Sequence, residues 1–186
     1  MRILRLLAGY TAGHSLRKWK TAVPMDEQQI DVAAYRRALS CFATGVTVVT
    51  TLDGDARRVG ITVSSFNSVS LDPPLVLWSV GKDSLSYDAF VNADSFIVNV
   101  LSSRQSDLAN RFAAKRADKF VGLDCLSGID GIPILPGSAA CFECRTEHLY
   151  EGGDHTIIVG RVQEFAEYAA DPLIIYRSDY LRSGDS

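Results

Sequence analysis

The sequence predicts a mainly β protein, built as an antiparallel barrel with helices laid on its outside. The first observation is that the β-branched and aromatic segments adjoin one another in two runs, whereas a doubly wound parallel sheet would alternate each strand with a helix. The second is that a chain of 186 residues with 47% hydrophobic and 22% charged residues is typical of one globular domain with a sizeable core.

The predicted strands are β-branched and aromatic runs bounded by Gly, Pro, Asp or Ser. They cover residues 46–51, 59–66, 75–80, 95–101, 139–150, 156–165 and 173–176. The turn Asp53-Gly54-Asp55 joins the first two strands as a hairpin. The predicted helices cover residues 26–43, residues 84–93 with Ser84 as the cap, and a segment from Ser102 to Ala114. Residues 121–138, rich in Gly, Asp and Pro, are expected to form a long surface loop.

Charge and hydropathy exclude two classes of partner. A net charge of −3 does not fit a protein that holds duplex nucleic acid on a basic face. No apolar run approaches the roughly 20 residues that a membrane-spanning helix needs. We therefore expect neither a nucleic-acid nor a membrane partner.

Residues 1–24 differ from the remainder, because they contain five basic residues and no acidic one. Arg5 interrupts the only apolar stretch, so the segment does not have the pattern of a signal peptide. We expect a disordered leader or a mis-assigned start, with Met25 as the working initiator and residues 25–186 as the domain.

The four cysteines include Cys141 and Cys144 in a CxxC pattern. A zinc site would need two more ligands at suitable spacing, and the sequence offers no second such pair. Residues three apart on a strand also face opposite sides. The sequence therefore predicts reduced, mostly buried thiols in a cytoplasmic protein, and no metal site.

Hydroxyl side chains are concentrated between Gly60 and Val76. They are Thr62, Ser64, Ser65, Ser68 and Ser70. One interpretation is a strand that holds a flat, oxygen-rich ligand. The other is the solvated face of an antiparallel sheet, where Ser and Thr alternate well.

Two further segments could hold a phosphate. Ser79 and Ser84 flank Gly81-Lys82 at a strand-to-helix junction, where backbone N–H groups and a lysine can bind an anion, although an ordinary helix cap has the same pattern. Residues 111–120 interleave Lys and Arg with Phe, which suits either a phosphate grip or a solvated helix face with two core aromatics.

The chain lacks GxGxxG, GxxxxGK[ST] and GxSxG, so no dinucleotide-binding helix, P-loop or hydrolase elbow is predicted. His155 follows two glycines and Asp154 in a turn, where the backbone can approach a ligand, but an exposed hairpin histidine is equally compatible. Because adjacent residues rarely point at each other, we do not expect Asp154 to contact His155. His148 is expected to be structural.

Taken together, these motifs resemble the short-chain flavin reductases, the NAD(P)H:flavin oxidoreductases of two-component flavin-dependent monooxygenases. The resemblance spans about residues 34–183. The motifs that carry it are Phe42-Ala43-Thr44-Gly45-Val46, Val48-Val49-Thr50, Gly60-Ile61-Thr62 through Ser64-Ser65-Phe66 to Pro73-Pro74, Arg111-Phe112-Ala113, Asp118-Lys119-Phe120, Gly153-Asp154-His155, Gly160-Arg161-Val162, Pro172-Leu173, Tyr176-Arg177 and Tyr180.

The resemblance implies an FMN-binding split β-barrel with Greek-key topology that works as a homodimer. It implies FMN or FAD as the flavin and NADH or NADPH as the reductant, with His155 as the catalytic residue. The resemblance implies that the isoalloxazine ring is lined by Thr62, Val63, Ser64 and Ser65. It implies that the ribityl-phosphate side is contacted by Ser79, Val80, Ser84, Lys119 and Phe120. It also implies that the nicotinamide faces Gly153, Asp154 and His155.

The implied reaction is hydride transfer to the flavin, with the reduced flavin passed to a partner oxygenase component. A non-catalytic flavin- or haem-binding split-barrel protein is the alternative, and the Gly153-Asp154-His155 turn counts against it. A split-barrel oxidase acting on a phosphorylated pyridine would need more phosphate-binding basic residues. The sequence does not discriminate FMN from FAD or NADH from NADPH.

Overall fold

A computed structural model describes residues 30–115 and 118–181. The chain divides into two compact units, residues 1–36 and 37–186, and the second contains every strand of the described chain. The leader expected at residues 1–24 lies outside the described residues. No helix of the described part is long and apolar enough to cross a bilayer.

Helix α1, Val32–Leu39, is shorter than the helix predicted over residues 26–43. Its start is set by Asp31, whose carboxylate accepts the amide hydrogens of Ala33 and Ala34 at 3.0 and 3.1 Å. An aspartate that satisfies the first free amides in this way caps a helix and ends its growth toward the N-terminus.

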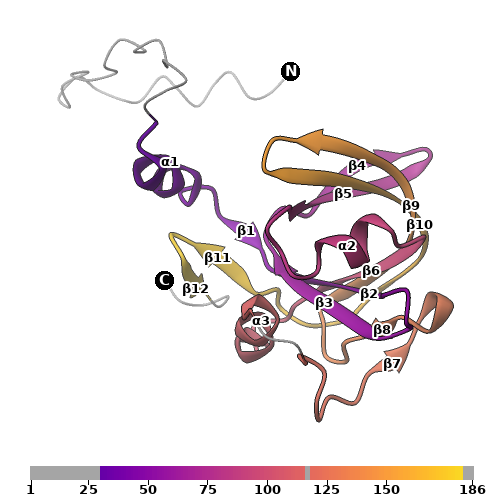
Figure 1. The fold of residues 1–186 in the computed structure, drawn as a ribbon. Helices are drawn as coiled ribbons and strands as arrows, with labels where there is room; N and C mark the ends of the chain where they lie inside the picture. Colours follow the sequence, from indigo (N-terminus) through magenta and orange to yellow (C-terminus); the bar gives the residue numbers. More distant parts are fainter. Residues whose placement is uncertain (1–29, 116–117, 182–186) are drawn as a thin grey trace, which may run out of the picture. The chain divides into compact units, whose positions relative to one another are not determined.

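Seven antiparallel strands form the main sheet in the order β3-β2-β6-β9-β10-β5-β4 (Figure 1). Its two edge strands, β3 and β4, are consecutive in the sequence and are joined only by Ser64, Ser65 and Phe66. The sheet therefore curls into an open barrel that is split at this connection, which confirms the predicted class. The strands are β2 Thr47–Leu52, β3 Arg58–Val63, β4 Asn67–Leu71, β5 Pro74–Gly81, β6 Ser95–Val100, β9 Ala140–Gly152 and β10 His155–Glu167.

The strand predicted over residues 59–66 ends earlier, at Val63, because the chain leaves the ladder there to cross the split. The surface loop predicted over residues 121–138 is also partly wrong. It contains the paired strands β7 (Leu126–Ser127) and β8 (Pro133–Ile134), a 3₁₀ turn at Ile129–Gly131, and buried apolar residues at 132, 134 and 135. A third sheet orders β1 (Thr44–Gly45), β11 (Ile174–Tyr176) and β12 (Asp179–Leu181), and the sequence did not predict β12.

Aromatic residues fill the barrel. Helix α2, Tyr87–Val91, places Phe90 edge-on against Trp78 with the ring centroids 4.8 Å apart, and Phe96 lies 5.9 Å from the same indole. Burying each such ring contributes about 1.5–3 kcal/mol. The prediction of Ser84 as the cap of this helix is wrong, because the Ser84 carbonyl accepts the Tyr87 amide in a separate turn before the helix begins.

Helix α3, Ser106–Ala113, packs against β3. It contributes Phe112, whose ring meets that of Phe120 edge-on with the centroids 5.0 Å apart. It begins later than predicted, since the Gln105 side chain accepts the Ser102 amide hydrogen at 2.9 Å and holds the preceding turn. Both rings are buried, so the aromatic residues of the segment 111–120 belong to the core.

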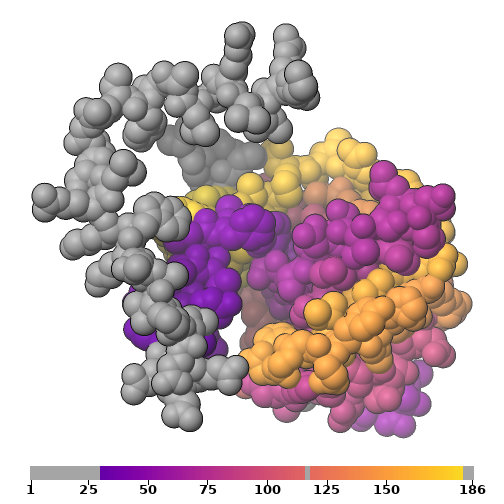
Figure 2. Space-filling view, turned by 90° about the horizontal axis from the view of Figure 1, so that it is seen from above, coloured from indigo at the N-terminus to yellow at the C-terminus, as the bar shows by residue number. Residues whose placement is uncertain are grey.

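The long β9–β10 hairpin, in orange, lies along β4 and β5, in magenta, on one face of the molecule (Figure 2). The ladder between β10 and β5 pairs His155 with Gly81. A residue from the hairpin turn is thereby placed beside the end of β5, next to the split.

Candidate functional site

A cavity of about 410 Å³, which we name the serine cavity, opens at the split of the barrel. It brings together eight of the twelve predicted site residues. They come from β3, the crossing 64–66, β5, the turn before α2, the segment after α3 and the hairpin. Its lining consists of Ile61, Thr62, Val63, Ser64, Ser65, Ser79, Gly81, Asp83, Ser84, Leu85, Ser86, Ala113, Ala114, Lys115, Lys119 and His155.

Four predicted site residues do not line this cavity. Val80 and Phe120 are buried in the core, and the side chain of Val80 faces the barrel interior because it alternates with Ser79 and Gly81 along β5. Gly153 and Asp154 lie in the turn between β9 and β10. Any contact of Val80 with a ligand would therefore come from its backbone.

Ser65 fixes the width of the split. Its hydroxyl oxygen accepts the Ser79 amide hydrogen at 3.0 Å, and the same hydroxyl lies 3.3 Å from the Ser79 carbonyl oxygen, to which it donates. In the described part of the chain, the backbone amides of Ser64 and Ser65 make no hydrogen bond. The crossing is thus held by one side chain, while two N–H donors are left beside the cavity.

Two polar side chains of the cavity wall are engaged within the protein. The Thr62 hydroxyl donates to the Ala109 carbonyl at 2.7 Å and fastens α3 to β3. The Lys119 ammonium donates to the carbonyl oxygens of Gly60 at 3.1 Å and Phe112 at 2.7 Å. The lysine still brings a positive charge to the wall, while the Thr62 hydroxyl holds the scaffold.

His155 lines the serine cavity, and a neighbouring side chain fixes its orientation. Its Nδ1 is 2.7 Å from a carboxylate oxygen of Asp154, so the expectation that these side chains do not meet is wrong. Asp154 lies in the turn, outside the alternation of the strand, which allows it to fold back. Because an ionised carboxylate only accepts, Nδ1 carries the hydrogen and Nε2 remains available to a ligand.

Gly81 provides the space next to His155, a role that sequence reasoning missed. A Cβ atom at this position would lie 3.0 Å from Oδ1 of Asp83 and 3.5 Å from Nε2 of His155. The signal was present as a glycine between two serine-bearing segments, but the pairing of Gly81 with His155 depends on a strand register that the sequence does not display.

Lys82, expected near a phosphate, forms an ion pair with Glu151 of the hairpin and does not line the cavity. The hydrogen bond that the Lys82 ammonium donates to this carboxylate raises the pKa of Lys82. Lys115 takes the place near the cavity instead, with its ammonium 3.7 Å from Asp83. Sequence reasoning had included Lys115 only as part of a basic segment.

These features fit a flat, polar ring system with a phosphate tail. The two unpaired amides and the hydroxyls of Ser64 and Ser79 supply hydrogen-bonding groups, and Gly81 leaves open the space beside His155. Lys115 and Lys119 supply positive charge near the turn that contains Ser84. Cavities of this size and mixed lining are typical of cofactor sites.

Comparisons with known proteins agree with this geometry. The model of the "Flavin reductase like domain" family matches residues 39–184. A probable flavin reductase of Rhizobium meliloti is 44% identical over 84% of this chain, and the chain spans 50% of the length of that relative. The reductase subunit HsaB of a flavin-dependent monooxygenase from Mycobacterium tuberculosis is 41% identical, over 82% of each chain.

A solved structure shows the same likeness. The NADH:FAD oxidoreductase SgcE6 of Streptomyces globisporus, in complex with NAD and FAD fragments, superposes with a TM-score of 0.78 at 38% identity, over 84% of this chain and 95% of that one. The split barrel, the cavity at its split and these matches lead to one conclusion. The chain belongs to the family of flavin reductase-like domains.

Proposed function

We propose that this protein transfers a hydride from NADH or NADPH to FMN or FAD and supplies the reduced flavin to a partner monooxygenase. The observation that carries the proposal is the serine cavity, which combines two unpaired amides with a histidine oriented by Asp154. The names of the relatives support it, since HsaB is a monooxygenase reductase subunit and SgcE6 an NADH:FAD oxidoreductase.

The protein's part in this reaction is positioning and electrostatics. A bound flavin supplies the redox chemistry, and the reduced flavin gains negative charge on the edge of its ring. The amides of Ser64 and Ser65 donate toward that edge, and the bond between Ser65 and Ser79 keeps them in place before the charge develops. Donors that need not reorganise stabilise a developing charge most effectively.

His155 orients the reductant. Asp154 holds the imidazole so that Nε2 accepts a hydrogen, which suits an amide N–H of nicotinamide. Hydride transfer needs the two reacting atoms about 3–3.5 Å apart, so a residue that fixes the pyridine ring affects the rate even though it moves no proton. Ser64 lines the cavity and is exposed, so a ligand can reach this wall from the solvent.

One assay tests the activity. The protein is mixed with NADH or NADPH and with FMN or FAD, and the absorbance of the reduced nicotinamide is followed. We expect oxidation of the nicotinamide that depends on added flavin and shows multiple turnovers. Flavin that binds without any nicotinamide oxidation would instead support a non-catalytic binder and refute the proposed reaction.

We further propose that the protein is a cytoplasmic homodimer. Large apolar side chains on β4 and β10 favour self-association: Leu71 is 94% exposed and Phe165 70%. Free thiols at all four cysteines suit a reducing compartment. Light scattering coupled to gel filtration should give twice the chain mass of 20.3 kDa, and a monomeric mass would refute the dimer.

A further inference from the structure

We propose that a groove beside the serine cavity binds the adenosine diphosphate end of FAD, and that Arg58 makes the protein prefer FAD to FMN. This inference rests on the proposed function and deepens it, because it names the flavin. FMN ends at its single phosphate, whereas FAD continues into a second phosphate and an adenosine. A preference for FAD therefore requires a second binding surface that is continuous with the first.

Such a surface is present. A second cavity of about 750 Å³, which we name the arginine cavity, is lined by residues that include Arg57, Arg58, Val59, Gly60, Phe120 and Val121. It shares Leu85, Ser86 and Lys119 with the serine cavity, so the two are continuous. Each lies within the range of roughly 300–1,000 Å³ that is usual for ligand sites.

The charges of the arginine cavity suit a diphosphate. Three basic side chains, Arg57, Arg58 and Lys119, line it together with the carboxylates of Asp53 and Asp118. Asp53 is already bound by Arg57 at 2.8 Å.

The carboxylate of Asp118 accepts the Phe120 amide hydrogen at 3.0 Å. Arg58 is exposed, and its guanidinium makes no hydrogen bond or ion pair with any other residue in the described chain. An arginine of this kind is available for a charge-assisted, two-point contact with a phosphate.

Apolar surface for the adenine is also available. Leu85 lines both cavities and is 79% exposed, and Val121, which lines the arginine cavity, is 66% exposed. Exposed leucine and valine next to free arginine offer a planar base a place to pack close to its phosphates.

Another cavity whose lining includes Leu85 does not suit the same group. This third cavity, of about 630 Å³, is lined by five carboxylates, and Arg57 is the basic side chain in its lining. The carboxylates are Asp53, Asp55, Asp88, Asp94 and Asp130. Because like charges repel, an anionic tail leaving the serine cavity is directed into the arginine cavity.

NADH carries the same adenosine diphosphate group as FAD, so the position of the arginine cavity has to distinguish the two ligands. His155 lines the serine cavity but not the arginine cavity. The two cavities meet at Ser86 and Lys119, beside the turn of Ser84 where the flavin phosphate is expected. A ligand group that passes through this junction would be attached to the flavin phosphate. The junction therefore favours the adenosine diphosphate of FAD over that of the nicotinamide nucleotide, which approaches His155.

The experiment compares the variant Arg58→Ala with the control Arg104→Ala. Arg104 is also exposed and lines none of these cavities, so its loss removes the same charge elsewhere. Dissociation constants for FAD and FMN are measured by flavin fluorescence, and KM for NADH is measured with each flavin. We expect Arg58→Ala to weaken FAD binding by about tenfold, the effect of losing one charge-assisted contact, with FMN binding changed by less than about twofold.

Three outcomes would overturn the proposal: equal weakening of FAD and FMN, a raised KM for NADH with both flavins, or no change in either flavin. ADP provides a second readout, since it should compete with FAD more strongly than with FMN in the wild type and lose this competition in Arg58→Ala. Reduction of FMN by the wild type tests the proposed function separately, so failure of one claim leaves the other measurable.

Discussion

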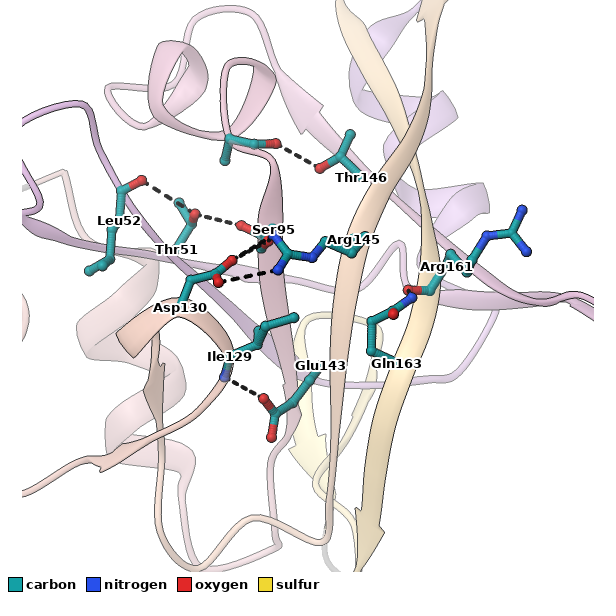
Figure 3. A network of polar contacts seen from close by, with 11 residues as sticks. Thr51, Leu52, Ser95, Ile129, Asp130, Glu143, Arg145, Thr146, Arg161 and Gln163 are labelled. Carbon is teal, nitrogen blue, oxygen red and sulfur yellow. Dashed lines mark hydrogen bonds and ion pairs between the residues drawn. The ribbon is translucent and has the colours of Figure 1, made fainter.

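Two polar regions of this barrel use serine in opposite ways. In the cluster of Ser95, Asp130 and Arg145 (Figure 3), the Ser95 hydroxyl donates to Asp130 at 2.7 Å and accepts from Arg145 at 2.8 Å. In the serine cavity, the amides of Ser64 and Ser65 have no partner in the described part of the chain. Polar groups that satisfy one another stabilise the fold, whereas polar groups left open are available to a ligand.

The rest of the Ser95 cluster follows the same rule. Arg145 from β9 holds Asp130 of the 3₁₀ turn at 2.7 and 3.2 Å, and the Thr51 hydroxyl donates to the Ser95 carbonyl at 2.8 Å. Glu143 accepts the Ile129 amide hydrogen of the same turn. The cluster therefore fastens the turn to the sheet, and we expect its variants to change stability while activity is retained.

Filling the space at Gly81 should produce the largest effect on the open region. Gly81→Leu would occupy the gap between Asp83 and His155, where even a Cβ atom comes within 3.0 and 3.5 Å. We expect flavin reduction to fall by about 100-fold, because displacement of a reactant by about 1 Å can have that effect.

Gly45→Leu is the matched control for this prediction, since a Cβ atom at that strand glycine would meet no atom within 4 Å. Steady-state oxidation of NADH and thermal melts are measured for both variants. Full activity in a folded Gly81→Leu protein would place the ligands elsewhere.

Removing the imidazole should have the next largest effect. His155→Ala removes the group that Asp154 holds at 2.7 Å, and we expect kcat/KM for the reduced nicotinamide to fall by about tenfold, the effect of roughly 1.4 kcal/mol. Flavin affinity should change much less. His148→Ala is the control, because His148 is exposed on β9 and packs against Tyr150 outside the serine cavity. An equal loss of flavin affinity would reassign His155 to the flavin.

The barrel was predictable because its signals are local. Runs of β-branched residues and the Asp53-Gly54-Asp55 turn specified β2 and its hairpin partner β3, and the hydroxyl-rich segment marked the edge where the barrel opens. The opposite orientation of Cys141 and Cys144 was predictable from the alternation of a strand, and the two pack in different core clusters.

The remainder depends on pairings between distant segments. The position of Gly81 next to His155 follows from the β5–β10 register, and the contact of Asp154 with His155 follows from the turn geometry. Likewise, the Thr62 hydroxyl is engaged by α3, which no pattern within β3 indicates. Sequence reasoning thus located the hydroxyls but could not separate those that fasten the scaffold from those that face the cavity.

Ser95→Ala tests the closed region. The variant removes a buried hydroxyl that bridges Asp130 and Arg145, so we expect the free energy of unfolding to fall by about 1–2 kcal/mol. Turnover should stay within about twofold of the wild type. Urea unfolding and the flavin reduction assay measure the two quantities, and Ser68→Ala, at an exposed position on β4, is the control. A loss of activity without loss of stability would contradict the division between the two regions.

The smallest effect should appear in the acid dependence of stability. The hydrogen bond from Ser95, followed by the charge of Arg145, lowers the pKa of Asp130 in the folded protein. A carboxyl with a lowered folded pKa stabilises the fold above its unfolded pKa of about 4, and this contribution is lost as the pH falls through the folded value. Asn tolerates the positive φ of 54° at this position, so Asp130→Asn isolates the charge.

The stability difference between wild type and Asp130→Asn should therefore be greatest near neutral pH and shrink below about pH 4. It should also shrink in high salt, because both side chains of the pair are close to half exposed. Glu147, whose pKa is lowered by its hydrogen bond from Arg161, titrates in the same direction in both proteins and cancels in the difference. A difference that stays constant from neutral to acid pH would show that the Asp130 carboxylate acts through shape alone, and the closed region would then owe its stability to packing of the turn.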